Sequence, residues 1–225
     1  MGANISIGSA DDFNLGVYVA EPSQAPSSAV IVIQEIFGVN QHIREVADGY
    51  AAAGHLAIAP KLFDRIDRNI ELGYDSTAMT EGISLAFSQL NMELALHDIQ
   101  AAVDFALTQV SSVAVVGYCF GGLMAWQSAC LLPGVAAASC YYGGGIAGHL
   151  ELIPRCPIMM HFGELDPHIP LTDVAKIEQA QAAVQVHVYA ADHGFNCDHR
   201  ASYEPNAAAL ARERTLAFFA EHLTA

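Results

Sequence analysis

The sequence predicts an α/β fold in which a mostly parallel sheet of about seven or eight strands carries helices on both faces. Short apolar runs alternate with helical patterns along the 225 residues, 53% of the residues are hydrophobic, and only 15% are charged. Residues 105–150 contain no Lys, Arg, Asp or Glu, and their most apolar stretch, residues 113–126, is shorter than the roughly 18 residues that a membrane span needs. We therefore expect one folded domain over residues 1–225, with a large buried core and no membrane segment.

The strands and helices follow from the spacing of apolar residues. Runs rich in β-branched residues predict buried strands at 28–33, 55–60, 112–116, 136–142, 157–162 and 184–189. A hairpin of residues 5–7 and 15–19 is expected ahead of them. Helical spacing predicts helices over 91–110, 123–131 and 205–223. In such sheets ligands bind at the carboxyl ends of the strands, so the loops after the strands should hold the functional residues.

The charge balance excludes one class of partner. Nine basic and 24 acidic residues give a formal net charge of −15, and the basic residues form no cluster. A nucleic-acid surface would need the opposite balance. The five cysteines are scattered, and the first residues show no basic and apolar leader, so we expect free thiols and a cytoplasmic protein. The sequence does not predict an oligomeric state.

A nucleophile motif follows the predicted strand at 112–116. Residues 117–122 read GYCFGG, which is the pattern glycine, any residue, nucleophile, any residue, glycine between a strand and a helix. The sharp turn puts Cys119 at a helix N-terminus, where the partial positive charge favours the thiolate. The N–H of Phe120 becomes available as an oxyanion donor. The alternative, an inert buried cysteine, does not explain the flanking glycines.

A general base and an acid that orients it are expected in later loops. Asp166 follows the strand at 157–162, and His193 follows the strand at 184–189, which gives the order nucleophile, acid, histidine found in α/β-hydrolase folds. Glu164 competes with Asp166, but a solvated loop position is expected for it. His168 and His199 are weaker candidates for the base and are expected at the surface.

Two other motifs are not expected to bind cofactors. His193, Cys197, Asp198 and His199 are metal-ligand types at close spacing, yet no second cluster or Cys-x-x-Cys pair accompanies them, so we expect no metal. Residues 143–148 match the glycine pattern of a dinucleotide site. Pro154 and Pro157 oppose the helix that such a site requires.

Glu35 lies directly after the first parallel strand, where a carboxylate is costly unless a partner stabilises it. The N–H of Ile36 is expected to be the second oxyanion donor, because this loop supplies it in α/β-hydrolases. The segment QEIFGVN at residues 34–40, together with GYCFGG, resembles the dienelactone hydrolase family, and the resemblance extends from about Ile5 to the last helix. It implies an α/β-hydrolase fold and a Cys119–His193–Asp166 triad. It also implies hydrolysis of an ester or lactone, of the carboxymethylenebutenolidase type, through a cysteine acyl-enzyme.

The resemblance further implies that Glu35 contacts Cys119 and helps to generate the thiolate. The chain departs from the family at the arginines that grip a substrate carboxylate: Cys197 stands where one is expected, and residues 75–90 contain no arginine. The remaining candidates for substrate contacts are Phe37, Arg65, Arg68 and Arg200. Two alternatives stay open, namely a carboxylesterase or thioesterase for a neutral substrate and a non-catalytic thiol redox sensor.

Overall fold

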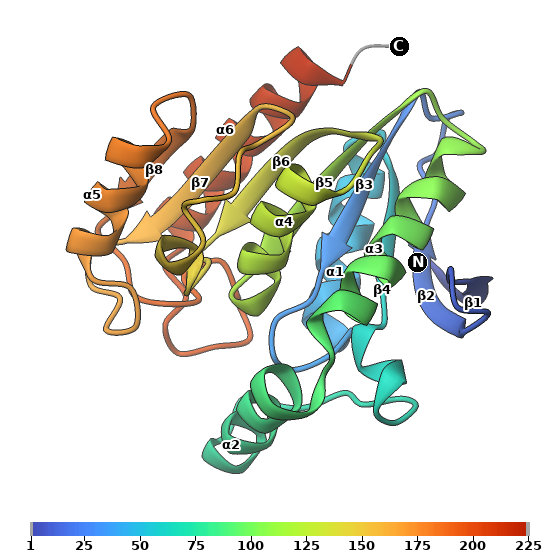
Figure 1. Ribbon diagram of the computed structural model, residues 1–225, viewed down its shortest axis with the longest axis horizontal. Helices are drawn as coiled ribbons and strands as arrows, with labels where there is room; N and C mark the ends of the chain where they lie inside the picture. Colours follow the sequence, from blue (N-terminus) through green and yellow to red (C-terminus); the bar gives the residue numbers. More distant parts are fainter. Residues whose placement is uncertain (1, 224–225) are drawn as a thin grey trace.

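An eight-stranded sheet forms the centre of the protein (Figure 1), which we describe from a computed structural model covering residues 2–223. Its strand order is β1-β2-β4-β3-β5-β6-β7-β8. The strands are β1 Ala3–Gly8, β2 Asn14–Ala20, β3 Ser28–Ile33, β4 Leu56–Pro60, β5 Ser112–Tyr118, β6 Val135–Tyr141, β7 Ile158–Gly163 and β8 Gln185–Tyr189.

The expected mostly parallel sheet is confirmed. Strands β4, β3, β5, β6, β7 and β8 run parallel, whereas β1 and β2 form an antiparallel hairpin that pairs with β4. Every residue of β3, β4 and β5 is buried, which explains why their sequences are continuous apolar runs. Each predicted strand lies within about one or two residues of an observed one, as boundaries read from sequence usually do.

Helices cover both faces of the sheet (Figure 1). Helices α1 (Gln41–Ala52) and α6 (Pro205–His222) share one face, where Arg212 donates to the carbonyl of Gly49. Helices α3 (Met92–Leu107), α4 (Phe120–Leu131) and α5 (Leu171–Ala180) lie on the other. The sequence reasoning placed α3, α4 and α6 but did not place α1, α2 or α5.

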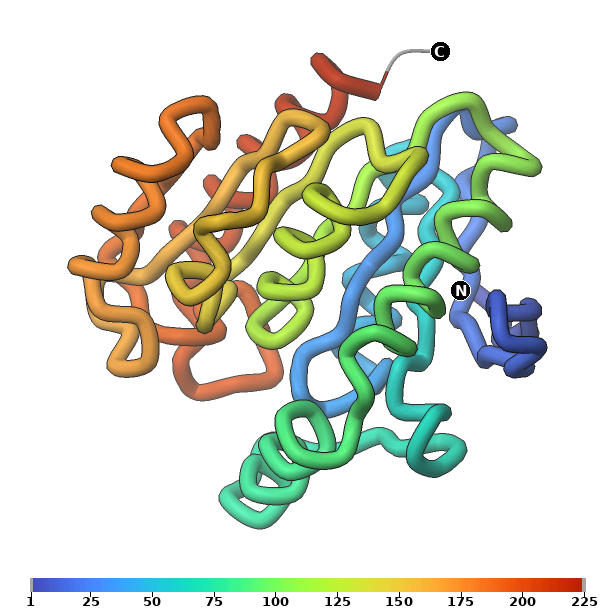
Figure 2. Tube along the Cα trace, in the orientation of Figure 1, coloured from blue at the N-terminus to red at the C-terminus, as the bar shows by residue number. Residues whose placement is uncertain are grey.

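Helix α2 (Ser76–Ser84) and the π-helical turn η2 (Leu85–Gln89) extend beyond the carboxyl end of the sheet (Figure 2). Helix α2 contacts the loop after β3 through Gly82. A Cβ at Gly82 would lie 2.4 Å from the carbonyl oxygen of Ile36, so only glycine allows α2 to approach the loop after β3 this closely. Two 3-10 turns, η1 (Leu62–Arg65) and η3 (Ile146–Gly148), complete the elements.

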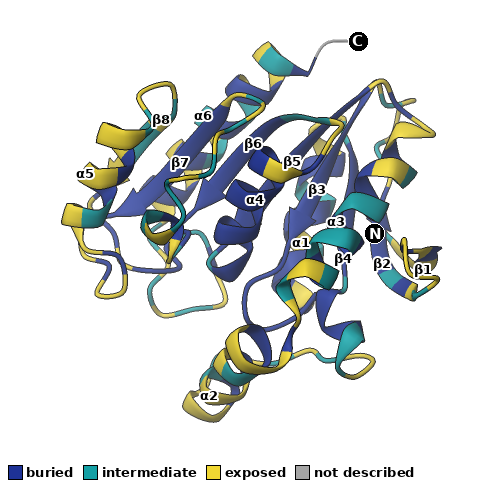
Figure 3. Cartoon of the chain, viewed as in Figure 1, coloured by how far each residue is buried: buried dark blue, intermediate teal, exposed yellow. Residues whose placement is uncertain are grey.

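The long segment without charged residues forms the centre of the sheet and the helix against it. Residues 105–150 contain β5, α4 and β6, and α4 is buried along almost its whole length (Figure 3). This burial on all sides explains why α4 lacks a polar face. Among the described residues, no helix combines the length and the hydropathy needed to cross a membrane.

Candidate active site

Cys119 stands at the sharp turn between β5 and α4. Its backbone has φ 55° and ψ −116°, a left-handed φ that a side-chain-bearing residue rarely adopts. Its own N–H donates to the carbonyl of Tyr141 at 3.0 Å, and its carbonyl accepts the N–H of Gly122 at 2.9 Å. These bonds hold the strained residue in place, so its partly exposed thiol sits at the first turn of α4.

The glycines of the motif are required by backbone contacts. A Cβ at Gly117 would lie 1.8 Å from the carbonyl oxygen of Gly121, and a Cβ at Gly121 would lie 2.5 Å from the carbonyl oxygens of Ile33 and Gln34. Side chains at these positions would push the nucleophile turn away from β3. Backbone crowding therefore requires glycine on both sides of Cys119.

Cys119, His193 and Asp166 form a hydrogen-bonded chain. His193 Nε2 lies 3.1 Å from Cys119 Sγ, and His193 Nδ1 lies 2.7 Å from Asp166 Oδ2. The other carboxylate oxygen of Asp166 accepts the backbone N–H of His168 at 2.8 Å. Asp166 and His193 are buried, whereas Glu164 is exposed, so burial separates the two candidate acids. The three side chains come from the loops after β5, β7 and β8.

The hydrogen bonds among these side chains stabilise a charged pair of His193 and Asp166. Burial opposes a charge on His193, but the Cys119 thiolate and the hydrogen bonds to Asp166 and Cys119 outweigh it and raise the pKa of His193 to about 10. Burial also opposes the charge on Asp166, yet the hydrogen bond from His193 lowers the pKa of that carboxyl below its usual value. A protonated His193 beside the Asp166 carboxylate is therefore favoured near neutral pH.

The other thiols have a different environment. Burial raises the pKa of Cys130 and Cys197 to about 12 and that of Cys156 to about 11. Thiols with pKa values this high are poor nucleophiles at neutral pH. Among the five free cysteines, the hydrogen bond to a histidine ring distinguishes Cys119.

The two expected oxyanion donors lie at the ends of β3 and β5. Phe120 is the first residue of α4, so its N–H has no partner within the helix. Ile36 is buried in the loop after β3, which Gly121 contacts from α4 and Gly82 contacts from α2. Close packing on both sides keeps this loop beside the nucleophile turn, where two N–H groups could hold a negatively charged oxygen.

Glu35 faces Arg200 in this structure. Its carboxylate is fully buried, its Oε1 lies 3.5 Å from Arg200 Nη1, and neither carboxylate oxygen has a hydrogen bond within the described residues. Burial opposes the charge of Arg200, but the Glu35 carboxylate raises its pKa above the usual value. The guanidinium also lies 5.8 Å from the ring centre of Phe37 and 6.0 Å from that of Tyr74. The carboxylate thus has a cation as its neighbour instead of a direct bond to Cys119.

A turn after β8 brings Arg200 to this place. The N–H of Arg200 donates to the carbonyl of Cys197 at 3.1 Å, and this turn directs the arginine side chain back over Gly194. A Cβ at Gly194 would lie 2.4 Å from Arg200 Nη1, and Gly194 has φ +78°. The absence of a side chain at Gly194 therefore leaves room for Arg200. The position of the missing family arginine holds the buried thiol of Cys197.

Arg65 and Arg68 are occupied by other carboxylates. Arg65 makes a two-pronged pair with the buried Asp98, at 2.7 and 2.9 Å, and also binds Asp11. Arg68 binds Asp64 at 2.9 Å and the carbonyl of Asn14 at 2.7 Å. These contacts tie the N-terminal hairpin to η1 and α3. Because their charges are neutralised there, we do not retain these two arginines as substrate contacts.

Phe37, which the sequence offered as a candidate substrate contact, is buried. Its ring is buried and packs edge-on against Tyr74, with 4.7 Å between the ring centres. A buried ring cannot offer its face to a substrate without moving. Phe37 therefore packs beside the Glu35–Arg200 pair.

Tyr142 belongs to the site, although the sequence reasoning missed it. It follows β6, has φ 36°, and its ring centre lies 5.1 Å from that of His193. Burial, followed by the nearby Glu35, Cys197 and Cys119, raises its pKa well above the usual value, and its hydroxyl has no partner within the described residues. Its position directly after a parallel strand was the available signal.

The glycine-rich segment 143–148 has a packing role in this structure. A Cβ at Gly122 would lie 2.8 Å from the Cα of Gly143, so the two glycines let α4 approach the chain after β6. The segment continues into the short turn η3 and then β7, without the α-helix that a dinucleotide site uses.

Comparison with known proteins identifies the family of the chain. The profile of the dienelactone hydrolase family matches residues 15–223. A Synechocystis sp. protein that carries a carboxymethylenebutenolidase name is 37% identical, over 92% of this chain and 91% of its own. The carboxymethylenebutenolidase of Pseudomonas putida is 34% identical, over 96% and 95%.

A solved structure from Klebsiella pneumoniae, which carries a dienelactone hydrolase name, superposes with a TM-score of 0.86 at 31% identity and covers 98% of both chains. These matches also confirm the expected α/β-hydrolase fold. The protein belongs to the dienelactone hydrolase family and is a hydrolase.

Proposed function

We propose that this protein hydrolyses a carboxylic ester or lactone through a covalent Cys119 intermediate. The observation that carries the proposal is the chain of contacts from Asp166 through His193 to Cys119 at the nucleophile turn. Relatives named carboxymethylenebutenolidase support a lactone as one substrate class. The small-molecule substrate is the partner on which the site acts.

In the first half of the reaction, the Cys119 thiolate attacks the carbonyl carbon and the carbonyl oxygen becomes negatively charged. The N–H groups of Ile36 and Phe120 stabilise that oxygen. As the intermediate collapses, the bond to the alcohol oxygen breaks and the His193 imidazolium gives its proton to that oxygen. A thioester on Cys119 remains. In a lactone, the released hydroxyl stays attached to the acyl group.

In the second half, neutral His193 takes a proton from water while the water oxygen attacks the thioester carbon. The carbon–sulfur bond then breaks, which releases the carboxylic acid and returns the thiolate beside an imidazolium. Asp166 keeps the imidazole in the required orientation and stabilises its positive charge. We assign Glu35 and Arg200 to the substrate side of the nucleophile. An anionic group of the substrate could there replace the Glu35 carboxylate beside Arg200.

A neutral ester or thioester is the second candidate substrate. The apolar surface beside the nucleophile turn favours it: Phe87, 58% exposed, lies edge-on to Phe120 with 5.7 Å between the ring centres, and Ile83 on α2 is 48% exposed. Arg200 is already paired with Glu35. The five free thiols suit a reducing compartment, and we therefore place the protein in the cytoplasm.

The decisive experiment compares the wild type with Cys119→Ala on aryl esters, thioesters and a lactone prepared with and without a carboxylate. Cys156→Ala is the matched control, because it also removes a partly buried thiol. We expect Cys119→Ala to lose at least about a thousandfold in kcat/KM, because the nucleophile is gone. Quenched wild-type samples should show the acyl mass on the intact protein.

Full activity of Cys119→Ala would contradict the mechanism. A wild type that turns over none of these substrates, but whose Cys119 oxidises and recovers with thiol reductant, would favour the redox-sensor alternative. A preference for the neutral lactone would favour the second substrate class.

A further inference from the structure

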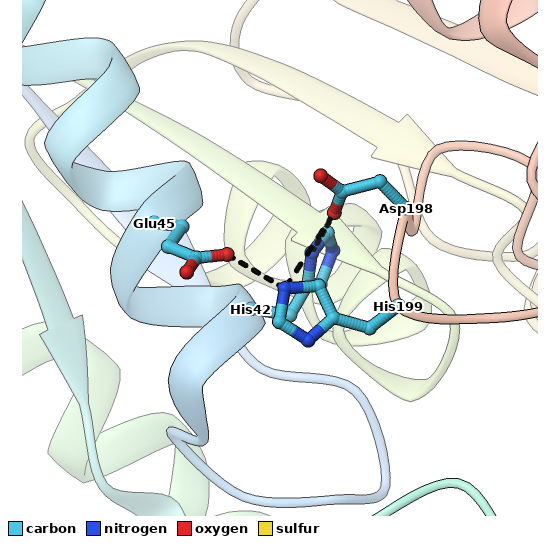
Figure 4. Close-up of side chains that lie close together, drawn as sticks. All are labelled: His42, Glu45, Asp198 and His199. Carbon is cyan, nitrogen blue, oxygen red and sulfur yellow. Dashed lines mark hydrogen bonds and ion pairs between the residues drawn. The ribbon is translucent and has the colours of Figure 1, made fainter.

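A second cluster of polar side chains lies between α1 and the loop after β8. It consists of His42 and Glu45 of α1 and of Asp198 and His199 of the loop, and we refer to these four residues as the α1–loop cluster (Figure 4). One ligand atom from each residue lies within 4.8 Å of the ligand atoms of the other three. None of the four takes part in the chemistry proposed above.

The fold brings the four side chains together from distant parts of the chain. His42 and Glu45 are three residues apart on α1, so they project from the same face of the helix. Asp198 and His199 follow the turn in which the N–H of Cys197 donates to the carbonyl of Gly194. Figure 4 shows all four side chains pointing toward one another. The i, i+3 pair on a helix is a spacing that metal-binding helices also use.

The distances between these side chains bracket those between the ligands of a zinc ion, and one of them falls within that range. Ligands bound tetrahedrally at about 2.0–2.2 Å lie about 3.3–3.6 Å apart. His42 Nδ1 lies 3.3 Å from Asp198 Oδ1, His199 Nε2 lies 3.8 Å from Asp198 Oδ1, and His199 Nε2 lies 2.7 Å from Glu45 Oε2. Small rotations of the exposed Glu45 and His199 side chains would equalise these distances. Two imidazoles and two carboxylates form a donor set that suits Zn²⁺.

His42 supplies an independent indication of a ligand. Its side chain is only 3% exposed, its Nδ1 faces the cluster, and its Nε2 has no hydrogen-bond partner within the described residues. Atoms of His42, Glu35 and Cys197 also lie within 4.8 Å of one another, so the imidazole stands between the cluster and Glu35. A histidine that binds metal through one nitrogen commonly presents the N–H of the other to a carboxylate. Glu35 is the carboxylate near this imidazole, and no hydrogen bond joins its oxygens to His42 Nε2 within the described residues.

The cluster is accessible from solvent. His42, Glu45 and Asp198 line a surface pocket of about 410 Å³, together with residues of α1, α6 and the same loop. An ion could therefore enter without unfolding of the protein. A metal site needs such an entry path as well as suitable ligands.

We propose that His42, Glu45, Asp198 and His199 bind a zinc ion that fastens α1 to the loop carrying His193 and Arg200. His199 precedes Arg200 directly, so the ion holds the segment that places the guanidinium beside Glu35. The site is structural, and the reaction at Cys119 does not pass through the metal. It differs from the metal set weighed from the sequence, because His193 and Cys197 are replaced by two residues of α1.

The test measures zinc bound at equilibrium to the folded chain. All proteins carry Cys119→Ser, so that zinc held by the active-site thiol does not contribute. We expect one equivalent of Zn²⁺ per chain by calorimetry and by elemental analysis after desalting. Glu45→Gln combined with His199→Ala should weaken binding by at least about a hundredfold, because two of four ligands are lost. Both side chains are partly exposed, and circular dichroism checks that the variant folds.

The matched control is His149→Ala, which removes a surface histidine whose Nδ1 lies 3.7 Å from Glu151 Oε1. It should bind zinc as tightly as its parent. Zn²⁺ should raise the melting temperature of the parent and of this control but not that of the double variant. With Co²⁺ as probe, the spectrum should lack a thiolate charge-transfer band, since all four ligands are nitrogen or oxygen.

Three results would overturn the proposal. The parent could bind no stoichiometric zinc, which would leave the cluster as two histidine–carboxylate ion pairs. The double variant could keep the parent affinity, or the cobalt spectrum could show thiolate ligation. In either case the metal would be held at another place, and the α1–loop cluster would not be a zinc site.

Discussion

Removal of the Arg200 guanidinium should destabilise the protein much more than removal of a surface arginine. Arg200→Gln leaves the Glu35 carboxylate, which is fully buried and has no hydrogen bond within the described residues, without its cation. A buried charge that loses its partner keeps the cost of desolvation without the compensating attraction. The pair is also 3.5 Å apart, so the attraction that is lost is a short-range one.

The magnitude follows from Coulomb's law. At 3.5 Å and an effective dielectric constant of about 20, two unit charges attract by about 5 kcal/mol. The Arg200 side chain is 14% exposed, and water therefore compensates part of that loss. We expect a decrease of about 3 kcal/mol in the free energy of unfolding, in line with other broken buried pairs. For a chain of this length, that corresponds to a melting temperature roughly 6–12 °C lower.

The assay is urea unfolding at pH 7 of the wild type, Arg200→Gln, Glu35→Gln and the double variant. Because Glu35→Gln removes the buried charge itself, it should cost less than Arg200→Gln, and the double variant should be more stable than Arg200→Gln alone. The coupling energy should be about 2–3 kcal/mol. Arg44→Gln is the control, since Arg44 pairs with Glu71 at the surface at 2.7 Å and should contribute less than about 1 kcal/mol.

The reasoning would be refuted if Arg200→Gln unfolded at the same urea concentration as the wild type. It would also be refuted if the effects of the two single substitutions simply added in the double variant. Either result would mean that Glu35 and Arg200 do not stabilise each other in solution.

Two further predictions concern histidines. Asp166→Asn keeps the shape of the side chain but removes the charge that stabilises the His193 imidazolium, so kcat/KM should fall roughly 10²- to 10⁴-fold; wild-type activity in this variant would exclude Asp166 as the acid. His161 is buried and bonds Tyr189 and Thr215 through its two ring nitrogens, and burial holds its pKa well below the usual 6.5. Below about pH 6.5 the unfolded chain therefore binds a proton that the folded chain excludes, and stability should fall with decreasing pH by up to about 1.4 kcal/mol per unit. Urea unfolding between pH 7 and 5 should show a shallower decrease for His161→Gln than for the wild type, and equal slopes would rule out His161 as a source of this dependence.

Much of the fold could be predicted because a buried parallel strand leaves a clear trace in sequence. Strands β3 and β5 are continuous apolar runs, since both of their faces are covered. Helix α1 was not predicted, although its buried residues Ile43, Val46, Ala47, Tyr50 and Ala51 recur at helical spacing and could have indicated it. The N-cap Asn40, whose side chain accepts the N–H of Ile43, was the local signal for its start.

The candidate triad could be proposed from sequence for a related reason. Cys119, Asp166 and His193 each follow a parallel strand closely, and the carboxyl ends of parallel strands meet at one edge of the sheet. The residues that contact the substrate were harder to predict from the sequence. Arg65 and Arg200 are equally plausible in sequence, and only their neighbours separate them: Asp98 and Asp11 hold Arg65, whereas Glu35 holds Arg200.

The sequence by itself determined the sheet, the nucleophile turn and the order of the candidate catalytic residues, because these depend on local periodicity and on glycines that neighbouring backbone requires. Only the tertiary structure decided which charges meet. Glu35 and Arg200, or His42 and His199, are separated by more than 150 residues, and no local pattern records that the turn at Cys197 brings them together. Pairing between side chains depends on the packing of distant elements and on burial, which a linear sequence does not show.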